Sequence, residues 1–255
     1  VTLRDAAGIP VIGKSVSISS NRGPVDTIAP ASVTSNVAGV ALFTVKSPTA
    51  GQAVITATDL TSNLTLPQTA FITFLSGATS STQSSIVISP GSVAVGSLAT
   101  VTVTLRDANN NPLAAKEVRL TSNRSANDPI TPAVAGSNSA GVASFNIASN
   151  LAGTSLVTAT VTTDNVTLSQ SPSITFVTDT PSPSVSTFFV SPTTVLLGAP
   201  ATATVTLKDG NGNLVAGKSV SVTSNRGSSD TISPGTVVTN GSGIATFSEI
   251  GRAHV

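Results

Sequence analysis

The sequence predicts an all-β protein built from tandem sandwich units, and three observations predict it. The pentapeptide that begins at Val1 returns at Val103 and, with one conservative change, at Val205, so the chain repeats every 102 residues. Val, Thr, Ser and Ala dominate, and β-branched residues favour strands because their stiff side chains suit a pleated surface. Apolar and polar residues alternate in short runs between turn residues, and no window shows a convincing helical period.

Two further blocks keep the same register, which indicates duplication of one module. The tripeptide Ser-Asn-Arg begins at Ser20, Ser122 and Ser224. A Gly-aliphatic-Ala-x-Phe block begins at Gly39, Gly141 and Gly243.

Residues 79–180 show the strand pattern of one whole module. Ala99 to Asp107 alternates apolar and polar residues, as a half-buried strand does, and a turn follows at 109–112. Further runs of this kind are centred on residues 86–88, 93–95, 117–121, 142–147, 157–161 and 170–178. About seven short strands in roughly 100 residues, separated by turn signals, predict an immunoglobulin-like β-sandwich.

The repeat divides the chain into three units. We expect unit 1 at residues 1–77, unit 2 at 78–179 and unit 3 at 180–248, with polar linkers at 77–85 and 178–184. Unit 1 has no counterpart of residues 79–102, and unit 3 has none of the last two strands. We therefore expect unit 2 to be complete and both flanking units to have unpaired edges and a partly open core.

Residues 249–255 depart from the repeat after Ser248 and resemble the translation of a sequencing-library adapter. We expect them to be foreign to the protein and exclude them from functional reasoning. His254, the only histidine, falls in this tail, and the chain has no cysteine. Since no base, nucleophile and metal ligand are available together, the sequence predicts no catalytic residue and no cofactor.

Composition also argues against several classes of partner. The net charge of +1 gives no reason to expect nucleic acid or an anionic membrane. No apolar run approaches the roughly 20 residues of a transmembrane helix. Trp and Tyr, on which sugars generally stack, are absent, and the eight Phe residues are expected mainly in the core. Phe188 and Phe189 are the exception, and at least one of them is expected to pack in the sandwich or at a joint.

The turn after the first long strand is the best candidate for a metal site. Three oxygen-bearing side chains are spaced two apart in unit 2 and again in unit 3, like the start of a calcium loop. They are Asp107, Asn109 and Asn111, and Asp209, Asn211 and Asn213. Unit 1 has Ala7 and Ile9 at the matching positions, and no downstream acid completes a ligand set. Since Asp, Asn and Gly are also hairpin residues, we favour a plain turn and predict no metal.

An Arg-x-x-x-Asp pairing recurs in every unit. The pairs are Arg22 with Asp26, Arg124 with Asp128, and Arg226 with Asp230. They could form an exposed contact site for a partner. We favour the interpretation that each pair pins a long loop through an ion pair or side-chain-to-backbone bonds.

Three stretches resemble the bacterial Ig-like group 1 (Big-1) family. They are residues 201–220, residues 239–247, and Ala152-Gly153 followed by residues 157–159. The family occurs in tandem in invasin- and intimin-like surface proteins. The resemblance implies an Ig-like fold and a spacer role, with adhesive activity in a distal domain that lies outside this sequence.

We therefore expect a structural stalk at a bacterial surface, extracellular and either outer-membrane anchored or secreted. Its partners would be the neighbouring repeats and, through the distal domain, a protein ligand. Two alternatives remain open. The loops could bind a host or matrix ligand directly, or the repeats could belong to a virion or another secreted protein.

Overall fold

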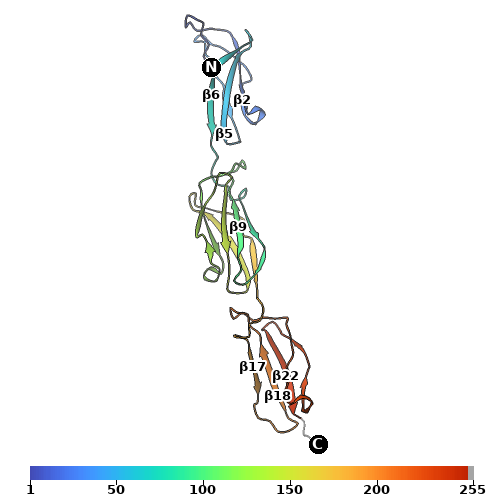
Figure 1. The fold of residues 1–255 in the computed structure, drawn as a ribbon. Helices are drawn as coiled ribbons and strands as arrows, with labels where there is room; N and C mark the ends of the chain where they lie inside the picture. Colours follow the sequence, from blue (N-terminus) through green and yellow to red (C-terminus); the bar gives the residue numbers. More distant parts are fainter. Residues whose placement is uncertain (252–255) are drawn as a thin grey trace.

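The computed structural model describes residues 1–251 and contains three β-sandwich units that follow one another end to end (Figure 1). This confirms the predicted all-β class of tandem Ig-like units. The helical elements among these residues are the single 3₁₀ turns η1 (Gly23–Val25), η2 (Ser125–Asn127) and η3 (Gly227–Ser229). In the described part of the chain, no helix has the length and apolar character needed to cross a membrane.

Unit 2 has a six-stranded sheet and a four-stranded sheet. One has the strand order β12-β10-β14-β16-β8, with β15 beside β14, and the other has the order β11-β13-β9-β7. The strands are β7 (Ser85–Ser89), β8 (Ser92–Ala94), β9 (Ala99–Thr104), β10 (Glu117–Ser122), β11 (Ile130–Thr131), β12 (Val134–Gly136), β13 (Val142–Ile147), β14 (Gly153–Val161), β15 (Val166–Thr167) and β16 (Ser173–Val177).

The core of unit 2 follows from the alternation in its strands. In β9 and β13 every second side chain is buried, because successive residues of a strand point to opposite faces. Phe145 and Phe176 from the two sheets are each 1% exposed. Gly141 has a φ of +80°, and a Cβ there would lie 2.5 Å from the backbone oxygen of Leu105, so this position requires glycine.

Unit 1 has one four-stranded sheet, in the order β3-β1-β5-β6, and a separate two-stranded pair, β2-β4. Its strands are β1 (Ser15–Ser20), β2 (Thr27–Ala29), β3 (Val33–Thr34), β4 (Thr44–Lys46), β5 (Gly51–Asp59) and β6 (Leu64–Phe74). Three residues form its buried cluster: Leu3, Val16 and Ala41.

Unit 3 has a four-stranded sheet, in the order β17-β18-β22-β20, and the pair β19-β21. Its strands are β17 (Thr187–Ser191), β18 (Pro200–Thr206), β19 (Ser219–Val220), β20 (Asp230–Ser233), β21 (Val237–Val238) and β22 (Ile244–Gly251). Its buried cluster also has three residues: Ala203, Ala245 and Phe247.

The structure corrects some details of the predicted elements. The strand expected over Ala99 to Asp107 ends at Thr104, because the Asp107 amide turns back to bond the Asn111 carbonyl. The expected linker 77–85 is largely packed on unit 2, where Thr79 and Ser84 are buried.

The expectation that Phe188 or Phe189 would be packed is wrong, since they are 58% and 54% exposed. Phe188 occupies the repeat position of Ile86, which is buried in unit 2 within a cluster that includes residues of β14 and β16. The described part of unit 3 contains no strand that corresponds to these two.

The expected foreign tail is only partly described. Glu249 to Gly251 continue β22 and pair with β18 and β20. Residues 252–255, with His254, lie outside the described residues. The proposed boundary at Ser248 remains a prediction.

Candidate functional site

The same turn occurs in all three units, after β9 in unit 2 and after β18 in unit 3, and the aspartate at its start shapes it. Asp107 Oδ1 accepts hydrogen bonds from the backbone amides of Asn109 and Asn111, at 2.9 and 2.8 Å. Asp209 bonds the amides of residues 211 and 213 in the same way. Asp5 bonds the amides of residues 7 and 9, both at 2.9 Å. An aspartate side chain that bonds the backbone two residues on is a typical turn device.

The last asparagine of this turn reaches the preceding unit. Asn111 Nδ2 donates to the carbonyl of Pro48 at 2.9 Å, and its Oδ1 accepts from the amide of Ala50 at 2.8 Å. Asn213 repeats both bonds one unit later, to Asn150 O at 2.9 Å and from Ala152 N at 3.1 Å. One carboxamide thus pairs with a carbonyl and an amide two residues apart, as a backbone peptide group would.

The aspartate of each turn also anchors the linker and the asparagine. Asp107 Oδ2 accepts from Gly77 N at 2.7 Å and from Asn111 Nδ2 at 2.9 Å. Burial by itself raises the pKa of Asp107, but the hydrogen bonds from Gly77, Asn111 and the turn amides outweigh it. The pKa of Asp107 is therefore below its usual value, and the side chain is a buried carboxylate.

The joint between units 2 and 3 has the same anchor. Asp209 Oδ2 accepts from Asp179 N at 3.2 Å and from Asn213 Nδ2 at 3.0 Å. Burial again acts to raise the pKa of Asp209, while bonds from Asn213, Asp179 and the Asn211 amide lower it below the usual value. Linker and turn are thus tied together at both joints.

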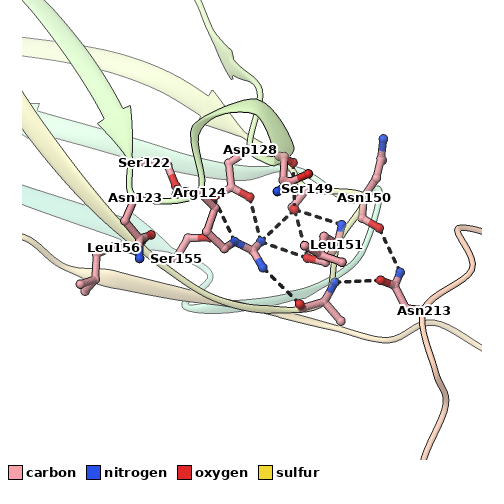
Figure 2. Close-up of polar contacts among 12 residues, drawn as sticks. Ser122, Asn123, Arg124, Asp128, Ser149, Asn150, Leu151, Ser155, Leu156 and Asn213 are labelled. Atoms are coloured by element: carbon pink, nitrogen blue, oxygen red, sulfur yellow. Dashed lines mark hydrogen bonds and ion pairs between the residues drawn. The ribbon is translucent and has the colours of Figure 1, made fainter. Parts of the chain in front are cut away.

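The loop that receives the asparagine is held by the Arg-x-x-x-Asp pair of its own unit, as Figure 2 shows for unit 2. Arg124 donates to the carbonyls of Leu151 and Ala152 at 3.0 and 3.1 Å and to Ser149 Oγ at 2.8 Å. Its guanidinium also pairs with Asp128 at 2.8 Å and lies 5.5 Å from the Phe176 ring centroid. We call this arrangement the arginine clamp.

The side chain of Asp128 is fully buried within the arginine clamp. Burial by itself raises its pKa, whereas hydrogen bonds from Arg124 and three serines lower it, so that the pKa of Asp128 is below the usual value. The serines are Ser122, Ser149 and Ser155. The carboxylate is therefore ionised at neutral pH and paired with the arginine.

Unit 1 has the same clamp, and unit 3 has an open version of it. Arg22 donates to Gly51 O, Thr49 O and Ser47 Oγ at 3.0, 2.6 and 2.7 Å, and lies 3.3 Å from Asp26. Arg226 Nε lies 3.5 Å from Asp230 Oδ1, and its side chain is 54% exposed, against 14% for each of the other two arginines.

The positions that resemble a calcium loop are occupied by these protein contacts. Asn109 and Asn211 are exposed, and Asn111 and Asn213 turn their amide nitrogens toward the aspartates. Among residues 1–251, no group of three or more His, Cys, Asp or Glu side chains is placed to hold a metal ion. The oxygen pattern therefore serves the joint in this structure.

The contact between units was missed by sequence reasoning, which placed the two motifs in separate roles. Residues 48 and 111 are 63 positions apart, and nothing in the turn motif or in the Arg-x-x-x-Asp motif indicates that the two lie close together. One signal was available: an asparagine occurs at the same repeat position in units 2 and 3, at Asn111 and Asn213.

Comparisons with known proteins agree with this architecture. Residues 83–177 match the family model described as bacterial Ig-like domain (group 1). No curated protein matches the sequence significantly. Several solved structures share the fold.

Invasin, described as a bacterial integrin-binding protein, is 24% identical with a TM-score of 0.58, over 99% of this chain and 50% of that chain. The chain thus spans about half of the invasin structure. The Escherichia coli adhesin FdeC is 20% identical with a TM-score of 0.64, over 98% of this chain and 82% of that one. InvD from Yersinia pseudotuberculosis is 19% identical with a TM-score of 0.58, over 99% and 76%.

Proposed function

We propose that this chain, whose middle unit belongs to the bacterial Ig-like domain (group 1) family, is a spacer of a bacterial cell-surface adhesin. The observation that carries the proposal is the repeated joint. At both joints an asparagine and an aspartate connect the turn of one unit, the linker and the clamped loop of the preceding unit. Bonded joints favour a semi-rigid array whose reach grows with the number of units.

The placement at a cell surface is supported by the family and by the fold shared with adhesins. The spacer role is favoured over direct ligand binding because the repeated arginines of units 1 and 2 and the asparagines of both joints are engaged within the protein. Arg22 and Arg124 point into their own loops, and Asn111 and Asn213 bond the neighbouring unit.

Small-angle X-ray scattering of the whole chain tests the spacer role. A sandwich of this size is about 40 Å long, at roughly 3.3 Å per strand residue plus loops, so three units in a semi-rigid array extend over about 120 Å. We expect a maximum dimension near this value and little change with salt. A markedly shorter average dimension would indicate loose joints and would count against the spacer.

A cell-adhesion assay separates the spacer from a direct binding module. Beads that carry the whole chain should attach to cultured epithelial cells no more than beads that carry an unrelated Ig-like domain. Saturable attachment that soluble chain competes away would instead support binding through the loops.

A further inference from the structure

Unit 1 shows that the turn does not need its last asparagine. Ile9 occupies the position of Asn111 and Asn213, yet the Asp5 turn keeps the bonds from the amides of residues 7 and 9 and the Asp5 N–H to Ile9 O bond at 3.0 Å. The backbone of the turn is thus formed with an aliphatic side chain in place. The carboxamide of Asn111 is therefore surplus to the turn and is accounted for by what it contacts outside its own unit.

Burial accompanies the contacts of both asparagines. Asn111 and Asn213 are 6% and 9% exposed, and each is buried where its turn meets the preceding unit. A buried carboxamide is costly unless its donors and acceptor are bonded, and here the same partners satisfy it at both joints. At position 111, isoleucine could form no side-chain hydrogen bond. Aspartate would lack the N–H donor and would place a second carboxylate beside Asp107.

The receiving surface is equally specific. It consists of the carbonyl of one loop residue and the amide two residues later, and these are held in place by the arginine clamp. In unit 1, Arg22 bonds Thr49 and Gly51 on either side of the amide of Ala50 that Asn111 binds. In unit 2, Arg124 bonds Leu151 and Ala152 in the loop that Asn213 binds (Figure 2).

From these contacts we propose that Asn111 and Asn213 are the orientation-setting residues of the joints. Each recognises the clamped loop of a preceding Ig-like unit, and its side chain limits the angles between the two units. This inference rests on the proposed spacer function, since a spacer requires a defined angle. We call the side chain of Asn111 or Asn213, with its bonds to the preceding unit, the latch. Unit 1 has Ile9 at this position and therefore has the turn without the latch.

Distance measurements between spin labels test the proposal in the whole chain. The chain has no cysteine, so cysteines introduced at Ser19, Thr121 and Thr223 can be labelled in pairs. These exposed positions are equivalent in the three units. The pair 19/121 reports on the first joint, and the pair 121/223 reports on the second.

Asn111→Ile, which introduces the residue of unit 1, is expected to broaden the 19/121 distance distribution about two-fold, because adjoining domains move freely unless contacts restrain them. It should leave the 121/223 distribution unchanged, and Asn213→Ile should do the reverse. Asn109→Ala is the matched control. It introduces the alanine that unit 1 has at the equivalent position, Ala7. Asn109 is exposed, and its side chain forms no hydrogen bond with residues 1–251, so this variant should leave both distributions as they are.

Each outcome bears on one proposal. Narrow distributions in both wild type and Asn111→Ile overturn the latch but leave the spacer intact, whereas broad distributions in the wild type overturn the spacer itself. Asn111→Asp keeps the shape and removes the donor, so a distribution as narrow as the wild type would also overturn the latch. Hydrogen exchange of β10 and β14 verifies that unit 2 remains folded, and if Asn111→Ile unfolds it, Asn111→Asp and the second joint decide.

Discussion

Unit 2 and its neighbours have the same repeat but different cores. The buried cluster of unit 2 has eighteen residues, whereas the buried clusters of units 1 and 3 have three residues each. Phe145 is 1% exposed in unit 2, while Phe43 at the same repeat position is only partly buried. In unit 2, β13 pairs with both β9 and β11, whereas β4 of unit 1 pairs with β2 alone among the strands.

From this comparison we infer that the local pattern and the buried core contribute separately to stability. The turns, the arginine clamp and the alternation are present in unit 1 although its buried cluster is small. Local hydrogen bonds shape these features, but burial of apolar surface between two sheets is the main driving force for folding. We therefore expect the joints of this chain to connect units of unequal stability.

The largest expected effect is a difference in amide hydrogen exchange between the units. Amides of β14 in unit 2 should exchange at least about 100-fold more slowly than those of β5 in unit 1, because they are released only when the larger core opens. The same difference is expected between β9 and β18. Exchange followed by mass spectrometry or NMR measures this, and equal protection in all three units would refute it.

A smaller effect is expected from the arginine clamps, and it should differ between units 2 and 3. Arg124→Ala should destabilise unit 2 by about 3 kcal/mol, since it leaves the buried Asp128 carboxylate without its cation. Arg226→Ala is the matched control, and because this arginine is exposed it should cost less than about 1 kcal/mol. Denaturant unfolding, read from amides of each unit, measures both. Equal losses would mean that burial of the pair does not matter.

The smallest expected effect is the response of unit 2 to acid. Because the pKa of Asp128 is lowered on folding, its contribution is fully present above the unfolded value of about 3.9 and is lost as the pH falls through the folded pKa. A contribution of about 1 kcal/mol corresponds to roughly 4–8 °C in the melting temperature of a domain of this size.

The variant Asp128→Asn isolates that contribution. It should melt below the wild type at pH 7, and the difference should shrink as the pH falls from about 3.9 through the folded pKa of Asp128, because the wild-type carboxylate then takes up a proton. A difference that stays constant over this acid titration would show that the charge of Asp128 does not stabilise unit 2.

The sequence predicted the strands well because each depends on local alternation. The runs at 142–147 and 117–121 correspond closely to β13 and β10. It was less successful where a distant partner decides the outcome. At least one of Phe188 and Phe189 was expected to be packed, but both are exposed, and Ser84 lies in the predicted linker but is buried. Strands and turns elsewhere in the chain determine the exposure of these residues.

The sequence alone therefore determined the module, its length, its register and the Asp-based turn, because these depend on spacing along one chain. The tertiary structure decided what the repeated Asn and Arg do. Only in three dimensions does the loop at 48–50 meet Asn111, and the resulting bonds account for a buried carboxamide that the turn does not require. Sequence spacing cannot show that contact, because it depends on how one folded unit is placed against the next.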